Sequence, residues 1–340
     1  MRKKRKREHI ENYLRTTYKG DTLFEDIFIE HNSLPNLNFS DIDTTTNFLG
    51  KEVGCPIIIN AMTGGSEFAH EINRELSLIA KEYNIPMAVG SQTIALCDDV
   101  ECRESFSIVR ETIGDDGIVI ANLSAQSSID DVEKALDMIK ADAIQLHLNP
   151  AQEIVMLEGD RDFRGILENI ETIAKTIDKP VIVKEVGFGV SKEVATKLYN
   201  IGIRNIDISG FGGTNFIEIE NIRYNSIDFS ELYSWGIPTA LSLIKCRELP
   251  KDLNIISSGG IRSSMDIVKS LILGGQMVGI SGEILSYLLH GGYENVRDYM
   301  EATTHKMKII MVLLGKKNIE ELKTTEYKII GDLKELLNSR

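Results

Sequence analysis

Two glycine turns late in the chain decide the fold, in the segments Asn254-Ile255-Ile256-Ser257-Ser258-Gly259-Gly260 and Met277-Val278-Gly279-Ile280-Ser281-Gly282. Each segment is a short apolar run that ends in small residues, which is typical of a buried parallel strand leading into a turn. Such a turn can present backbone N–H groups to an anion, and the following helix adds partial positive charge. The alternative is a pair of tight turns that need glycine only for positive φ.

Six similar runs precede these two, and amphipathic segments with a helical period separate them. The eight expected strands are Pro56–Asn60, Met87–Val89, 117–121, Ala143–Leu148, 181–186, 205–208, 254–257 and Met277–Ile280. The expected helices are 67–83, 103–113, 129–140, 165–177, 192–201, 240–247, 264–273 and 283–289. Eight strand–helix units in series predict an α/β protein with a TIM (β/α)₈ barrel.

The rival architecture is a doubly wound open sheet, which normally carries its phosphate turn after the first strand. Here the best glycine turns follow strands seven and eight, the usual phosphate site of a TIM barrel. Asp130 and Ser191 are expected to begin helices, and Gly202 and Gly274 to end them.

Two terminal segments lie outside the eight predicted strand–helix units. We expect residues 1–54 to be an N-terminal extension with a basic segment, 55–293 to be the catalytic barrel, and 294–340 to be C-terminal helices of the same domain. The connection 209–238, after the sixth strand, is long enough to favour a functional loop. It contains Gly210–Asn215 and the only tryptophan, Trp235.

Charge is distributed unevenly along the chain. The net charge of −13 argues against a nucleic-acid-binding surface over most of the protein. Residues 1–9 carry six Lys or Arg and one Glu, a charge of +5, so the remainder sums to −18. This basic start is a solvated tail, an arm for nucleic acid or membrane, or a flap over an anionic substrate.

Nothing in the sequence points to export or to a membrane. No apolar region follows the basic start, as a signal peptide would require. No apolar run approaches the roughly 20 residues that span a bilayer. Cys55, Cys97, Cys102 and Cys246 have no disulfide-framework or metal-ligand spacing, so we expect reduced thiols and a cytoplasmic protein.

Lys184 lies inside the apolar fifth strand, where a lysine is costly unless it is paired or binds an anion. The functional interpretation places its ammonium beside a negatively charged cofactor atom, and the alternative is a lysine that reaches the barrel rim. His147 alternates with Gln145 and Asn149 at the end of the fourth strand, so it is either a functional group at the barrel mouth or a core histidine.

Glu153 follows the fourth strand and is a hard oxygen ligand suited to Mg²⁺, or else a solvated loop carboxylate. Asn60, Ser91 and Asn122 stand at strand ends, where they can hydrogen-bond a heterocycle or cap turns.

Taken in order, these residues resemble the type 2 isopentenyl-diphosphate isomerases, an FMN-dependent family, almost from end to end. The segments through Lys184 and through Gly-Gly-Thr-Asn-Phe are highly specific. The motifs that carry the resemblance are Arg5–Ile10, Asn60–Gly65, Ala88–Gln92, Gln145–Asn149, Gln152-Glu153, Val183–Gly189, Gly212–Phe216, Ser234–Gly236 and Ser258–Gly260.

The resemblance implies a role for each matching residue. Groups that contact FMN would be Ala61, Met62, Thr63, Ser91, Asn122, Lys184, Ser209 and Thr214, with Gly259, Gly260, Ser281 and Gly282 at its phosphate. Glu153 would ligate Mg²⁺ on the substrate diphosphate. Substrate contacts would come from Arg5, Lys6, His9, Asn149, Gln152 and Trp235, with the basic segment closing over the diphosphate. Trp235 would cover the isoprenoid, unless it is simply a packed loop aromatic.

The implied reaction interconverts isopentenyl diphosphate and dimethylallyl diphosphate by protonation and deprotonation, with reduced FMN, Mg²⁺ and NADPH as reductant. His147, Gln152 and the flavin are the candidates for moving protons, and Lys184 can stabilise an anionic reduced ring. The family also implies a homotetramer or homo-octamer. Glu283 departs from the family pattern at the phosphate turn. A carboxylate beside a phosphate is unfavourable unless it points away.

Two alternatives remain. One is an FMN-dependent 2-hydroxy-acid oxidase, which shares the cofactor turns but uses a histidine–arginine pair after the sixth and seventh strands. Here Arg262 follows the seventh strand, but no histidine follows the sixth. The other is a non-catalytic sensor that binds FMN or a diphosphate, which the retained substrate and metal positions disfavour.

Overall fold

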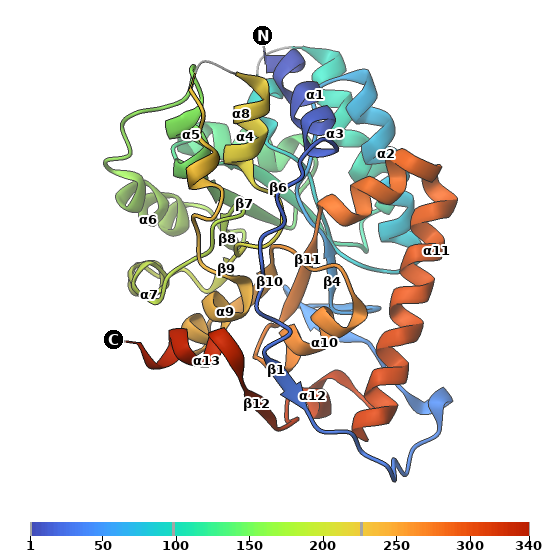
Figure 1. Ribbon diagram of the computed structural model, residues 1–340. Helices are drawn as coiled ribbons and strands as arrows, with labels where there is room; N and C mark the ends of the chain where they lie inside the picture. Colours follow the sequence, from blue (N-terminus) through green and yellow to red (C-terminus); the bar gives the residue numbers. More distant parts are fainter. Residues whose placement is uncertain (1, 97–98, 225–226, 340) are drawn as a thin grey trace.

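The computed structural model describes residues 2–96, 99–224 and 227–339, without the side chains of residues 2–5 and 7. Eight parallel strands form a closed barrel in the order β10-β11-β4-β5-β6-β7-β8-β9 (Figure 1). The strands are β4 (Ile57–Ile59), β5 (Met87–Ala88), β6 (Val119–Ser124), β7 (Ala143–Leu148), β8 (Val181–Glu185), β9 (Asn205–Asp207), β10 (Asn254–Ser258) and β11 (Met277–Ile280). The TIM-barrel prediction is confirmed.

The outer helices lie close to their predicted positions. They are α2 (Glu67–Glu82), α3 (Val100–Ile113), α4 (Ile129–Met138), α6 (Ile166–Thr176), α7 (Lys192–Asn200), α9 (Thr239–Arg247), α10 (Ser264–Ile272) and the start of α11 (Gly282–Leu314). Ser191 caps α7 as predicted, with its side chain accepting from the Val194 N–H. The prediction for Asp130 is wrong: it lies inside α4, which Ser128 caps through a capping box.

Side-chain alternation along the strands divides the barrel interior into two layers. Toward the amino ends of the strands the interior is apolar, with Ile58, Ile120 and Ile182 among its residues. Phe48 and Val53, from the hairpin of β2 (Thr46–Phe48) and β3 (Lys51–Val53), pack against this layer. The next inward positions are polar: Asn60, Asn122, Gln145, His147, Lys184, Asp207 and Ser258. This polar layer faces the carboxyl ends of the strands, where TIM-barrel sites form.

The chain ends add structure that the sequence did not predict. The N-terminal extension contains α1 (Arg2–Tyr13), β1 (Ile27–Ile29) and η1 (Phe39–Asp41), and the C-terminal segment contains α12 (Ile319–Leu322), β12 (Tyr327–Ile329) and α13 (Gly331–Asn338). β1 pairs antiparallel with β12, which joins the two terminal segments away from the site. α11 has a non-helical break at Gly292, close to the predicted boundary, and the proposed domain division stays a prediction.

Two α-helices and two 3₁₀ helices lie in the loops at the carboxyl ends of the strands. These are η2 (Gln92–Ala95), α5 (Pro150–Val155), α8 (Phe216–Arg223) and η3 (Ser230–Leu232). α1 packs on α8, and α8 packs on α5, so all three lie together at the upper end of the barrel in Figure 1. In the described part of the chain, no helix combines the length and apolar character needed to cross a membrane.

Candidate active site

A cavity of about 1070 Å³ opens at the carboxyl ends of the strands, beneath α1. This is enough room for more than one small ligand. The predicted site residues that line it are Lys6, His9, Ala61, Met62, Ser91, Asn122, His147, Asn149, Gln152, Glu153, Lys184, Ser209, Thr214, Gly259, Gly260, Ser281 and Gly282.

Three predicted site residues are not among those lining the cavity. The Arg5 side chain lies outside the described part of the structure. Trp235 is 65% exposed in the loop before α9 and does not line the cavity. Thr63 is buried and does not line the cavity, and its hydroxyl has no hydrogen-bond partner among the described residues.

The two glycine turns form one wall of the cavity, and their geometry requires glycine. Gly259 and Gly260 have φ of +100° and +70°. A Cβ at Gly259 would collide with the carbonyl oxygen of Gly210, and one at Gly260 with the backbone of Gly212. The loop after β9 therefore packs directly on the turn after β10. Ser281 precedes α11 without capping it through its side chain, so the first N–H groups of this helix remain available for an anion.

Glu283 is brought to the same wall, where it lines the cavity together with Arg262. Burial raises the pKa of Glu283, and the charge of Arg262 partly opposes that rise. The guanidinium of Arg262 donates to the carbonyl oxygen of Gly212 at 2.7 Å. An arginine beside this carboxyl group reduces the electrostatic conflict with a bound phosphate.

Lys184 lies in the polar layer and is 6% exposed. Its ammonium forms a salt bridge of 3.2 Å with Asp207, a fully buried carboxylate on β9. Ser209, two residues on, adopts φ of +34°, a strained conformation of the kind found at functional sites. A cationic side chain and two glycine turns that line one cavity together fit a flavin nucleotide, with the phosphate at the turns.

His147 lines the cavity from the end of β7. Burial lowers the pKa of His147 to about 4, and the charges of Lys184 and Lys6 add to the effect. The ring is therefore neutral at physiological pH, and its Nδ1 lies 2.9 Å from Oδ1 of Asn122.

Glu153 lies on α5 with both carboxylate oxygens facing donors. Asn149 donates to Oε1 at 2.8 Å, and the N–H of Asp160 donates to Oε2 at 3.0 Å. No cluster of three or more His, Cys, Asp or Glu that could hold a metal occurs among the described residues. One positioned carboxylate fits Mg²⁺ that takes its remaining oxygen ligands from water and a substrate phosphate.

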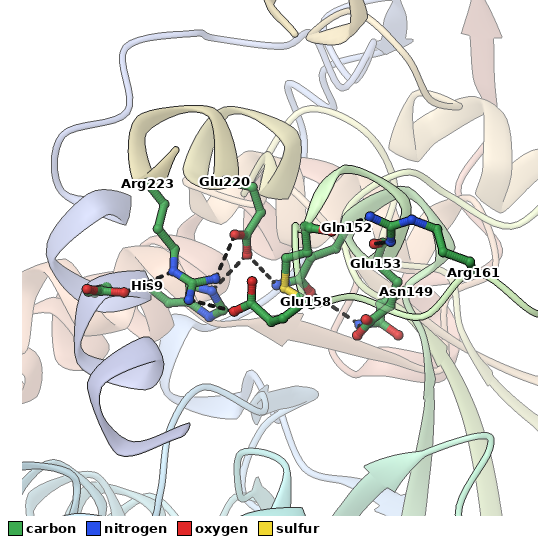
Figure 2. Close-up of polar contacts among 10 residues, drawn as sticks. His9, Asn149, Gln152, Glu153, Glu158, Arg161, Glu220 and Arg223 are labelled. Atoms are coloured by element: carbon green, nitrogen blue, oxygen red, sulfur yellow. Dashed lines mark hydrogen bonds and ion pairs between the residues drawn. The ribbon is translucent and has the colours of Figure 1, made fainter. Parts of the chain in front are cut away.

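Glu220 on α8 holds two predicted substrate contacts in place (Figure 2). Its Oε1 lies 2.8 Å from Nε2 of His9 and accepts from Nε2 of Gln152 at 3.1 Å. Burial alone would raise the pKa of Glu220, but the hydrogen bonds and charges around it, with His9 foremost, hold it below the usual range. His9 from α1 and Gln152 from α5 are thereby fixed on the same carboxylate.

Arg223, one helical turn further along α8, connects three segments around the cavity mouth (Figure 2). Its guanidinium forms salt bridges with Glu8 of α1 at 2.9 Å, Glu158 at 2.6 Å and Glu220 at 3.1 Å. Burial alone would lower the pKa of Arg223, but the hydrogen bonds that its guanidinium donates to the three carboxylates raise it. We call these four residues the Arg223 cluster.

The N-terminal helix reaches the cavity at two further points. Lys6 donates to the carbonyl oxygen of Ser91 at 2.7 Å and lies over the Phe106 ring. Tyr13 packs against Gly282, where a Cβ would collide with its phenol ring. Lys6 of the basic segment is therefore part of the cavity wall, and the closing of this segment over a substrate stays a prediction.

The prediction from sequence missed Asp207, Glu220 and Arg223. A signal existed for Asp207, because a carboxylate within the apolar run Asn205–Ile208 requires buried partners. Glu220 and Arg223 lie in the long connection after the sixth strand, where the sequence shows no period that distinguishes them from solvated charges.

The chain is similar to proteins of known family. Residues 128–328 match the family of FMN-dependent dehydrogenases. The chain is 46% identical to isopentenyl-diphosphate delta-isomerase of Bacillus pumilus, with 100% of the chain and 95% of the relative covered. It is 44% identical to the enzyme of the same name from a Geobacillus species, covering 100% of the chain and 97% of the relative.

Solved structures share the fold at low identity. Flavocytochrome b2 with pyruvate bound superposes with a TM-score of 0.72 and 19% identity, covering 96% of this chain and 84% of that one. A lactate oxidase of Pediococcus acidilactici gives a TM-score of 0.67 and 18% identity, covering 95% and 87%. These likenesses establish the barrel alone.

Proposed function

Because the chain belongs to the isopentenyl-diphosphate delta-isomerase family, we propose that it binds FMN and interconverts isopentenyl diphosphate and dimethylallyl diphosphate. The observation that carries the proposal is one cavity with two separate sets of groups suited to phosphates. One set is the pair of glycine turns, and the other is Lys6, His9 and Glu153. A small 2-hydroxy acid has a carboxylate but no diphosphate, so it would not need a carboxylate such as Glu153 to hold Mg²⁺.

The residues that line the cavity would serve the cofactor, the diphosphate and the metal ion separately. Bound reduced FMN would supply an electron-rich ring system that can exchange a proton and oppose positive charge in the substrate. Lys184 stabilises negative charge on the cofactor side, as its position in a water-poor interior favours. Lys6 and His9 bind the diphosphate, and Glu153 holds Mg²⁺ against it.

The candidates for moving protons are His147, Gln152 and the flavin itself. Gln152 is oriented by Glu220, and neutral His147 faces the cavity from β7. Both side chains line the cavity. NADPH as reductant, the homotetramer or homo-octamer and the cytoplasmic location remain part of the proposal, since they rest on the family resemblance.

One assay separates this function from the oxidase alternative. Purified protein with FMN, Mg²⁺ and NADPH, kept anaerobic, is expected to convert isopentenyl diphosphate into dimethylallyl diphosphate. The same preparation in air is expected not to oxidise lactate or glycolate. Oxygen-dependent turnover of either acid, without isomerisation, would favour the oxidase.

A further inference from the structure

A chain of hydrogen bonds crosses the barrel interior from Asp207 on β9 to His147 on β7. Asp207 Oδ2 accepts from Nδ2 of Asn60 at 2.6 Å, and Asn60 Oδ1 accepts from Nε2 of Gln145 at 2.9 Å. Gln145 Oε1 accepts from Nδ2 of Asn122 at 3.0 Å, and Asn122 Oδ1 faces Nδ1 of His147. We call Asn60, Gln145 and Asn122 the amide relay. Each is at most 3% exposed, so water does not replace these bonds.

The Asp207 end of the chain has a fixed direction. Oδ1 accepts from the N–H of Ser209 at 3.2 Å and from the hydroxyl of Ser258. Oδ2 accepts from Asn60 and forms the salt bridge with Lys184. Every partner of this carboxylate is a donor, and an ionised carboxylate can only accept. Asn60 must therefore turn its NH₂ group, and not its oxygen, toward Asp207.

Each amide then fixes the next, because it has one donor end and one acceptor end. With the Asn60 nitrogen committed to Asp207, its oxygen faces Gln145. Gln145 therefore turns its NH₂ group to Asn60 and its oxygen to Asn122, and Asn122 turns its NH₂ group to Gln145. Reversing any one amide would bring two acceptors or two donors together in a buried layer, which is strongly unfavourable. An oxygen of Asn122 is left facing His147, so Nδ1 of the ring carries the proton.

We propose that Asp207 acts as a positioning residue that sets the tautomer of His147 through the amide relay, so that an unprotonated Nε2 faces the cavity. Nε2 then accepts a hydrogen bond from an N–H or O–H group of a ligand, and it repels carbonyl and phosphate oxygens. This inference rests on the proposed function only for the identity of the ligand that contacts His147.

The test is ¹⁵N NMR of the full chain with labelled histidine and FMN added. The chain has six histidines, and the His147→Asn variant assigns the His147 signals. Two substitutions at Gln145 form a matched pair. Gln145→Leu breaks the relay at similar volume and leaves the Asp207–Lys184 pair in place. Gln145→Glu keeps an acceptor for Asn122, whether the new carboxyl group is ionised or protonated.

Wild-type protein and Gln145→Glu are expected to show the proton of His147 on Nδ1 alone. Gln145→Leu is expected to lose this single pattern and to show a population protonated on Nε2. A wild-type proton on Nε2, or a Gln145→Leu spectrum like that of wild type, would overturn the proposal. If Gln145→Leu does not fold, Gln145→Met, which also lacks both hydrogen-bonding groups, is expected to give the same loss and is judged in the same way. The readout needs no turnover, so failure of the isomerase assay is a separate result.

Discussion

At the scale of single residues, the site depends on charges held in a barrel interior with little water. Lys184 and Asp207 are both nearly inaccessible, and each is tolerated because the other compensates its charge. His147 is neutral in the same surroundings, since burial and the charges of two nearby lysines lower its pKa to about 4. The carboxylate of Glu153 is instead only partly buried and faces donors on α5 and the following loop.

Replacing Glu153 tests the metal site. Glu153→Gln keeps the shape of the side chain but removes the negative charge that Mg²⁺ requires. We expect the Mg²⁺ concentration for half-maximal activity to rise by about tenfold or more, equivalent to about 1.4 kcal/mol. The control is Glu168→Gln on the exposed side of α6, which should behave as wild type. Unchanged Mg²⁺ dependence in Glu153→Gln would remove this residue as the ligand.

The lowered pKa of His147 predicts a pH dependence of stability. Between about pH 6.5, the ordinary value, and about pH 4, the unfolded chain binds a proton at this residue and the folded chain does not. His147 therefore makes the folded state lose stability as pH falls through this window. Urea unfolding from pH 7 to 4.5 should show a shallower loss in His147→Asn than in wild type. Equal slopes would mean that His147 titrates normally.

At the scale of elements, the turns after β9 and β10 act as one unit. Gly210 and Gly212 leave room for the backbone of Gly259 and Gly260. The turn after β8 is also tied down by a neighbouring residue: Oε2 of Glu185 accepts N–H bonds from the residues that follow it, including Val186 and Gly189 at 2.7 and 3.2 Å. These loops are thus built to hold backbone donors and side chains in fixed places.

Gly259→Ala tests the phosphate turn against a control with the same backbone demand. Gly202 has φ of +98°, close to that of Gly259, but a Cβ there meets nothing within 4 Å. Both substitutions share the strain of a positive φ, about 1–2 kcal/mol. Only Gly259→Ala should also weaken FMN binding, by about tenfold or more, in a fluorescence titration. Equal FMN affinity in the two variants would show that the turn does not hold the cofactor.

At the scale of the whole molecule, the N-terminal helix completes a cavity that the barrel leaves open. α1 is held by the Arg223 cluster, by His9 on Glu220 and by Lys6 on the Ser91 carbonyl. Most of these bonds involve charged partners at a partly solvated rim. We therefore expect α1 to open more readily than any barrel strand.

Arg223→Met should release α1, because the three carboxylates of the Arg223 cluster lose the cation that holds them together. Hydrogen exchange of residues 2–13 should accelerate, and KM for the diphosphate substrate should rise by about tenfold or more. The control is Arg297→Met, which removes a partly exposed arginine whose salt bridge is with Glu294 within α11. Unchanged protection of α1 in Arg223→Met would show that the cluster does not hold the helix.

The sequence predicted the barrel well and its rim poorly, for one physical reason. Buried parallel strands must be apolar and helices must show a 3.6-residue period, so β7 and β11 were placed with their observed bounds. α1 is too basic to show such a period, and the pairing of β1 with β12 is a contact between opposite ends of the chain. Asp207, Glu220 and Arg223 owe their importance to partners far away in sequence, which no local pattern reveals.

Isomerisation in D₂O tests the central claim most directly. If the chain shifts the double bond by adding one proton and removing another, dimethylallyl diphosphate formed anaerobically with reduced FMN should carry deuterium in its newly formed methyl group. NMR of the product detects this. Absence of conversion with flavin bound and reduced would contradict the account, and so would product formed without any deuterium from solvent.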